Sequence, residues 1–228
     1  MKIDLKNFPK WNEINWIEFE ISNSIYALKK MFQIQTNGFE YLSLDIEQKI
    51  SSIKKENSNM QENELNQYIK HLFGLEEEII QNLKKIQKFS NIVIVFSITE
   101  SKLKIICDKI ERDFKFNIDL SNTKSVLSKH WKFLASFLEE RSEIIEKYYT
   151  PIRNMIEIRN IINHQDGIAT INQYKKICDI KGLKFILFED KYYLTSIDEN
   201  FVDILLKNID EFFIELLNSL KMRTNELL

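Results

Sequence analysis

Apolar residues recur at intervals of three or four along most of the chain, and this spacing predicts amphipathic helices. Within the first 60 residues the clearest helix is expected around residues 13–33. A polar, Asn- and Lys-rich stretch at 51–64 is expected to be a loop, and a long charged helix is predicted over 64–87. No chemical motif is evident in these segments.

A stronger helical pattern covers residues 91–114. Its opening run, Ile92 to Phe96, is also compatible with a buried strand, but the continuing spacing of three and four favours a helix. The apolar stripe of this helix is interrupted at position 100, which is Glu. Glu100 therefore places a carboxylate on a face that is otherwise apolar.

The next helix is expected to be capped by Asp119 or Ser121 and to run to about residue 140, with a further helical stretch to Tyr149. Thr150 and Pro151 then predict a new helix start, because Thr is a suitable N-cap and Pro suits the first helical position.

This helix is expected to extend over 151–165 and to end at Gly167, which can adopt the left-handed conformation of a C-terminal cap. After a short helix at 169–178, the pattern changes to alternation and predicts a β-hairpin at about 183–195. A final amphipathic helix is predicted over 199–221.

Composition supports a helical fold. The 228 residues are 44% hydrophobic but include only 4 Gly and 2 Pro, far too few for a turn-rich β architecture. We therefore expect an all-α helical bundle with a small C-terminal β-hairpin. Residues 1–88 are expected to form an N-terminal helical extension, and 89–228 a helical domain that contains the hairpin.

Charge and cysteine content narrow the expected ligands and the expected cellular location. The formal net charge of −2 provides no global basic field for nucleic acid, although residues 101–160 have a local excess of three positive charges. Two widely spaced cysteines do not form a disulfide framework. The N-terminal residues have no signal-peptide core, and the longest apolar stretch, 92–98, is too short to span a bilayer. A cytoplasmic protein without a membrane anchor is expected.

An arginine interrupts the apolar stripe of helix 151–165. This stripe is Ile152, Met155, position 159 and Ile162, and position 159 is Arg. An inward guanidinium is costly unless it is paired, so we expect Arg159 to face Glu100. A buried ion pair without a catalytic role is the alternative interpretation.

His164 lies five residues after Arg159, which is about 140° around an ideal helix. The two side chains therefore cannot stack side by side. Asn160 and His164 are four residues apart and share a face. Either the long Arg159 side chain reaches around the helix, or a second subunit completes the site.

The segment Arg159-Asn160-Ile161-Ile162-Asn163-His164 resembles the signature of the HEPN superfamily (higher eukaryotes and prokaryotes nucleotide-binding domain), in which Arg, a polar residue and, after a short spacer, His lie at a helix end. The resemblance covers roughly residues 90–228 and leaves 1–88 unassigned. It implies a small helical bundle, and it implies that the acidic Glu100 on an earlier helix supports the motif Arg.

The resemblance also implies an activity, since many HEPN proteins are metal-independent RNA endonucleases of toxin–antitoxin and phage-defence systems. It implies a homodimer with a composite active site, an RNA substrate, a possible antitoxin protein as partner, and no cofactor or metal. Arg159, His164 and Asn160 are the expected catalytic residues, and Glu100 and Asn163 the supporting ones.

The residue types suit this chemistry, because His can exchange protons near neutral pH and Arg binds phosphate oxygens with a planar fork. A second hypothesis is a non-catalytic helical module that binds nucleotide, RNA or a protein partner. A third is another enzyme class with an accidental resemblance, but the chain has no Gly-rich phosphate loop, GxSxG elbow or HExxH motif.

Overall fold

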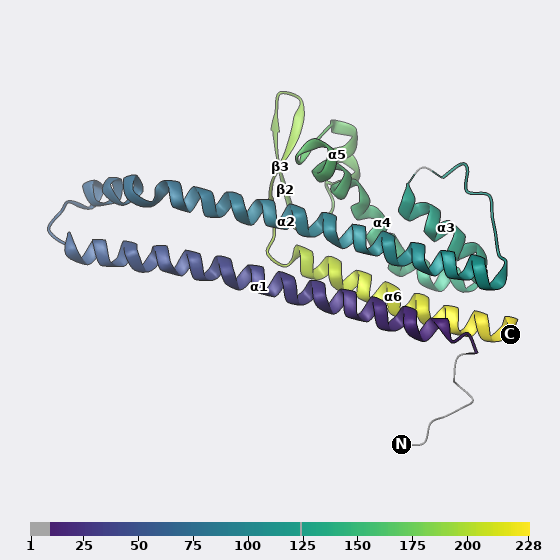
Figure 1. The fold of residues 1–228 in the computed structure, drawn as a ribbon. Coiled ribbons are helices and arrows are strands. Elements are labelled where there is room, and N and C mark those ends of the chain that lie inside the picture. The colour runs from purple at the N-terminus through teal and green to yellow at the C-terminus, as the bar shows by residue number, and fades with distance from the viewer. Residues whose placement is uncertain (1–9, 124) are drawn as a thin grey trace, which may run out of the picture. The chain divides into compact units, whose positions relative to one another are not determined.

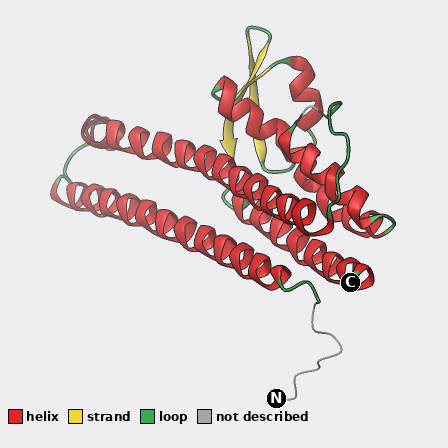
Figure 2. Cartoon of the chain, turned by 45° about the vertical axis from the view of Figure 1, so that its right-hand side comes forward, coloured by secondary structure: helices red, strands yellow, loops and turns green. Residues whose placement is uncertain are grey.

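The computed structural model describes residues 10–123 and 125–228, and these form six helices and one three-stranded sheet (Figures 1 and 2). The expected all-α fold with a small C-terminal hairpin is confirmed. In chain order the elements are α1 (Glu13–Glu56), α2 (Glu62–Phe114), α3 (Val126–Leu138), α4 (Arg141–Gln165), β1 (Ile168–Ala169), α5 (Ile171–Ile177), β2 (Leu183–Phe188), β3 (Lys191–Ile197) and α6 (Phe201–Leu227).

The chain divides into two compact units. The larger unit joins the residues up to Leu28 with residues 92–228, and the smaller unit is residues 29–91. The boundaries between the units lie after residues 28 and 91. The sequence analysis had predicted one boundary, after residue 88. Helices α1 and α2 each contribute residues to both units.

Two boundaries expected in the first half of the chain are wrong. The loop expected at 51–64 is limited to residues 57–61, because α1 continues to Glu56 and α2 begins at Glu62. The helices expected at 64–87 and 91–114 are one helix, α2. Residues 88–91 contain neither Gly nor Pro, so nothing in the backbone interrupts the helix there.

The core of the larger unit is built around aromatic rings from α3, α4 and α6. Trp131 and Tyr149 stack with ring centroids 4.6 Å apart, and Phe212 contacts both rings. The Trp131 indole N–H donates a hydrogen bond of 2.8 Å to Glu146, which satisfies the polar atom of a buried ring. These contacts tie α3 to α4 and position the rest of α4, which contains the motif.

Helix α3 begins later than expected. Its N-cap is Ser125, whose hydroxyl accepts a hydrogen bond from the N–H of Ser128 at 3.1 Å. Asp119 instead accepts a hydrogen bond from the N–H of Ser121 in the preceding loop. Both expected caps were therefore wrong, because Asp and Ser also stabilise turns outside helices.

Helix α4 begins at Arg141 rather than at residue 151, so Pro151 lies inside the helix. Packing explains this outcome, since Ile145 and Tyr149 are buried before the proline and Ile152 directly after it. The C-terminal end was predicted more closely. Gly167 has the expected positive φ of 84°, but the left-handed conformation already begins at Asp166.

Replacing Pro151 with Ala is expected to stabilise the protein. Proline inside a helix lacks the N–H that would bond the carbonyl four residues earlier, at a cost of up to about 3 kcal/mol relative to Ala. We expect the melting temperature of Pro151→Ala to rise by several degrees in a thermal unfolding experiment followed by circular dichroism. An unchanged or lower melting temperature would show that α4 is already adapted to the proline.

The C-terminal part contains the expected hairpin and one strand that was not expected. Strands β2 and β3 pair antiparallel around a two-residue turn, Glu189 and Asp190, and both turn residues have positive φ. The short β1 pairs with the other edge of β3, which gives the order β1-β3-β2. The predicted final helix is longer than expected and runs from Phe201 to Leu227.

Candidate functional site

Glu100 of α2 and Arg159 of α4 form the ion pair that the sequence predicted. One guanidinium nitrogen, Nη2 of Arg159, lies 3.1 Å from Oε2 of Glu100. The two side chains are only 22% and 20% exposed. The pair therefore lies at the edge of the core, where both charges are partly shielded from water and depend on each other.

The inward placement of Arg159 is only partial. The buried residues of α4 around it are Ile152, Ile158, Ile161 and Ile162, whereas Met155 is partly exposed. Ile152 and Ile162 of the expected stripe are buried as predicted, but Met155 and Arg159 are only partly buried, so Arg159 lies at the margin of the buried face. The Arg159 side chain as a whole is 22% exposed.

Asn160 takes part in the same cluster. Its side-chain oxygen accepts a hydrogen bond of 3.2 Å from Nη1 of Arg159. The Nε atom of Arg159 is buried and has no hydrogen-bond partner among the described residues. Glu100 and Asn160 thus hold the two terminal nitrogens, which fixes the plane of the guanidinium.

His164 and Asn163 lie in the last turn of α4 and are exposed. No hydrogen bond or ion pair of either side chain is present among the described residues, and His164 does not contact Arg159. A single chain therefore brings together Glu100, Arg159 and Asn160 but leaves His164 and Asn163 in solvent.

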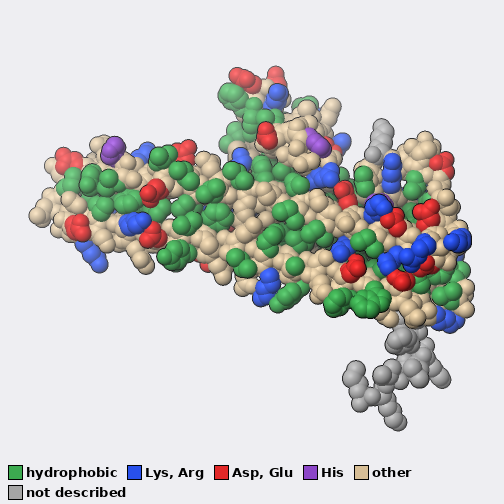
Figure 3. All heavy atoms as spheres, in the orientation of Figure 1, with side chains coloured by type: hydrophobic (Ala, Val, Ile, Leu, Met, Phe, Trp, Pro, Cys, Tyr) green, Lys and Arg blue, Asp and Glu red, His purple; other side chains and the backbone are tan. Residues whose placement is uncertain are grey.

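Arginine charge in this protein is neutralised within the chain. All five arginines form ion pairs with acidic side chains, so an arginine that binds phosphate would share its guanidinium with a carboxylate. Over the face shown in Figure 3, basic and acidic side chains are interspersed rather than segregated. The pairs are Arg112–Asp113, Arg141–Glu226, Arg153–Glu146, Arg159–Glu100 and Arg223–Glu139.

Glu146 is the centre of a polar cluster that the sequence analysis did not identify. Its carboxylate accepts hydrogen bonds from the indole of Trp131, the hydroxyl of Thr150 and the guanidinium of Arg153. The spacing of Glu146 and Thr150 places them on one helix face, but the contribution of Trp131 depends on tertiary packing. The cluster joins α3 to the middle of α4 and has a structural role.

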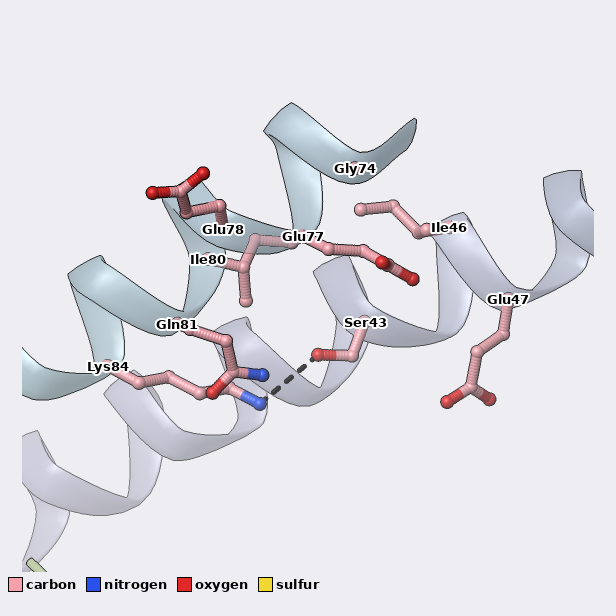
Figure 4. A pocket seen from close by; sticks show the side chains of 9 residues that line it. All are labelled: Ser43, Ile46, Glu47, Gly74, Glu77, Glu78, Ile80, Gln81 and Lys84. Atoms are coloured by element: carbon pink, nitrogen blue, oxygen red, sulfur yellow. Dashed lines mark hydrogen bonds between the residues drawn. The ribbon is translucent and has the colours of Figure 1, made fainter. Parts of the chain in front are cut away.

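Two hollows in the surface lie apart from these residues. One, of about 580 Å³, lies between α1 and α2 within the smaller unit, where Lys84 donates a hydrogen bond to Ser43 (Figure 4). The other, of about 360 Å³, is lined by residues of α4 and α6 that include Lys147, Pro151 and Glu211. Neither hollow is lined by Arg159 or His164.

Among the described residues no group of three or more His, Cys, Asp or Glu side chains is arranged to hold a metal ion. None of the described helices is both long and apolar enough to cross a membrane. No protein-family model, curated protein or solved structure matches the chain. A functional assignment therefore depends on the residues and on their geometry.

The two cysteines are expected to differ strongly in reactivity. Cys107 is buried, and burial raises the pKa of its thiol to about 12, whereas Cys178 is exposed. A raised pKa leaves the Cys107 thiol protonated at neutral pH, and only the thiolate reacts. At pH 8, a chromogenic disulfide reagent should label one thiol of the native protein rapidly and the second only after denaturation. Rapid labelling of both native thiols would contradict this.

Proposed function

We propose that the protein is a metal-independent endoribonuclease of the HEPN type that acts as a toxin or as a phage-defence effector. It would act as a homodimer in which Arg159 of one copy and His164 of the other share one site. The observation that best supports this is the Glu100–Arg159 ion pair, with Asn160 on the same guanidinium. This pair orients the arginine close to the end of α4, where His164 lies.

The reaction would be transesterification within the RNA strand. The 2′-oxygen attacks the adjacent phosphorus, the bond from phosphorus to the 5′-oxygen breaks, and the products are a 2′,3′-cyclic phosphate and a 5′-hydroxyl. A base must accept the proton of the 2′-hydroxyl, and an acid must give a proton to the leaving oxygen. Imidazole suits either role near neutral pH, so one His164 in each site can serve as the base or as the acid.

The other residues would bind and orient the phosphate. The guanidinium of Arg159 donates one hydrogen bond to Glu100 and one to Asn160, so further N–H groups remain for phosphate oxygens. The amide nitrogen of Asn160 can donate to the phosphate or to the imidazole. Asn163, exposed beside His164, would support the substrate from the same turn.

The alternative is a non-catalytic helical module that binds nucleotide, RNA or a protein partner. The geometry of a single chain favours it: His164 is exposed and forms no hydrogen bond or ion pair among the described residues, and the charge of Arg159 is already balanced by Glu100. Such a module would retain RNA or nucleotide binding without cleaving it. An antitoxin protein would be a further partner if the nuclease proposal holds.

Incubation of the purified protein with total RNA tests the proposal. We expect fragments that form in the presence of EDTA and that end in a 2′,3′-cyclic phosphate, detected by 3′ ends that resist tailing after phosphatase treatment alone but accept a tail when acid opens the cyclic ester before the phosphatase is added. Loss of cleavage in EDTA that Mg²⁺ restores would contradict the mechanism. RNA binding without cleavage would favour the non-catalytic alternative.

A further inference from the structure

Strand β2 forms a free edge of the C-terminal sheet. Among the described strands it pairs only with β3, and its other side has no strand partner. The hairpin turn extends beyond the helices of the larger unit (Figures 1 and 2). Unpaired N–H and C=O groups along such an edge are a template for a further strand.

Apolar residues are exposed along this edge. Ile186, Leu187 and Phe188 are 59%, 58% and 59% exposed, although all three are large hydrophobic residues. Figure 3 shows hydrophobic side chains gathered on the hairpin below the acidic turn at its tip. The strand contains no proline and a single charged residue, Lys184, so it has few of the features that normally protect an edge.

The hydrogen-bonding groups that face outward can be identified from the pairing register. Phe188 pairs with Lys191 directly beside the two-residue turn, and such a flanking pair exchanges both of its backbone hydrogen bonds. Because bonded and non-bonded pairs alternate, the backbone groups of Ile186 also point to β3, and those of Leu187 point to the free edge. The one irregularity in the pairing leaves Thr195 of β3 without a partner residue, whereas every residue of β2 is paired in turn. The backbone groups of β2 therefore alternate regularly between the two sides of the strand.

We propose that the free edge of β2 pairs antiparallel with β2 of a second copy of the chain, around a two-fold axis at Leu187. The Leu187 residues of the two copies would exchange both backbone hydrogen bonds. This proposal is independent of RNA cleavage. It gives one continuous six-stranded sheet and an isologous interface, in which the same strand is used by both copies.

Charge complementarity favours a second copy as the occupant and selects this register. With the axis at Leu187, Ile186 lies opposite Phe188 of the second copy, and Lys184, near the other end of β2, lies beside the acidic turn of Glu189 and Asp190 of the second copy. Neither Lys184 nor Asp190 has an ion-pair partner among the described residues. An axis at Phe185 would place Lys184 opposite the apolar Ile186, and an axis at Glu189 would place the two Glu189 carboxylates opposite each other.

Register-specific crosslinking tests the proposal, in full-length protein that has Cys178→Ser so that buried Cys107 is the only native thiol. Leu187→Cys should form a disulfide-linked dimer on mild oxidation, because residues opposite each other in an antiparallel pair lie within disulfide reach. Ile186→Cys is the matched control, since its opposite residue is Phe188. Mixing Ile186→Cys with Phe188→Cys chains should restore the crosslink.

We expect at least about tenfold more crosslinked dimer for Leu187→Cys than for Ile186→Cys alone, since only the first places two thiols opposite each other. Equal yields for both, or none for either, would overturn the proposal. A dimer that forms through another surface would give this second result.

Solution mass provides a second measurement. The native chain should migrate at about twice its monomer mass of 27.3 kDa, and Leu187→Pro should weaken the association about thirtyfold, because two hydrogen bonds are lost across the axis. If Leu187→Pro does not fold, Lys184→Glu gives the same test through charge. Its control is Lys181→Glu, an exposed site outside β2. Equal effects of the two Glu variants, or a monomeric native chain, would overturn the proposal.

Discussion

His164→Ala should lower the rate of RNA cleavage by about 10²- to 10⁴-fold, because general acid–base catalysis by a positioned side chain contributes that much. The fold should be unaffected, since His164 is exposed and makes no hydrogen bond or ion pair among the described residues. The measurement is the cleavage rate of an end-labelled RNA, with the melting temperature followed in parallel. If the melting temperature of His164→Ala is unchanged, the loss of activity comes from the missing imidazole and not from unfolding.

The matched control is His71→Ala. His71 is also exposed and also lies on a helix, but it belongs to the smaller unit, whereas the motif belongs to the larger one. The His71→Ala variant should cleave RNA at the rate of the unmodified protein. Cleavage that survives His164→Ala, or that falls equally in both variants, would remove His164 from the proposed site.

Mixing variants tests the shared site directly. If Arg159 of one copy acts with His164 of the other, a heterodimer of His164→Ala and Arg159→Ala chains contains one intact site. Random subunit exchange should then restore about one quarter of the unmodified activity, because half of the dimers are mixed and each has one of two sites. No recovery after exchange would indicate that the two residues act within one chain.

The Glu100–Arg159 pair could be predicted from the sequence for a simple reason. Each residue interrupts an otherwise apolar helical pattern, and two opposite charges near a core are stable only together. The two helical patterns are enough to predict the pair, and the connection between the helices does not have to be known. The degree of burial was not predicted, because Ile158 and Ile161 join the expected Ile152 and Ile162 on the buried face of α4 and Met155 does not.

Helix boundaries were less predictable, because local signals competed with packing. Thr150 and Pro151 have the chemistry of a helix start, yet α4 continues through them since the residues on both sides are buried against α3 and α6. Asp119 and Ser121 likewise have the chemistry of caps but form a turn. Tertiary contacts of this kind, such as Trp131 with Glu146, leave no periodic signal in the sequence.

The assembly of the candidate site is the part that a single chain does not determine. Arg159 and Asn160 are held by contacts within the chain, whereas the surroundings of His164 in an active protein depend on what approaches the end of α4. The position of the hairpin was predictable because alternation is a local feature, but its register and its two-residue turn were not predicted, since Lys191 belongs to β3. Its partner strand β1, only two residues long, was not predicted either.

Replacing Arg159 should both abolish cleavage and destabilise the protein. Arg159→Ala leaves the Glu100 carboxylate partly buried without its cation, so we expect the free energy of unfolding to fall by about 1–3 kcal/mol in urea denaturation. Arg159→Lys should recover much of this stability, because it keeps the charge. It should still cleave poorly, because an ammonium group lacks the planar fork that binds Glu100 and phosphate together.

A double-mutant cycle with Glu100→Gln separates the ion pair from other effects of each substitution. The coupling energy should be about 0.5–3 kcal/mol, so the double variant loses less stability than the two single variants together. The control cycle uses Lys104 and Asp108, an ion pair on the same helix α2 that is exposed to solvent. Its coupling should be much smaller, because exposed pairs are screened by water and salt. Equal coupling in the two cycles would mean that the Glu100–Arg159 contact holds the motif arginine no more firmly than a surface pair does.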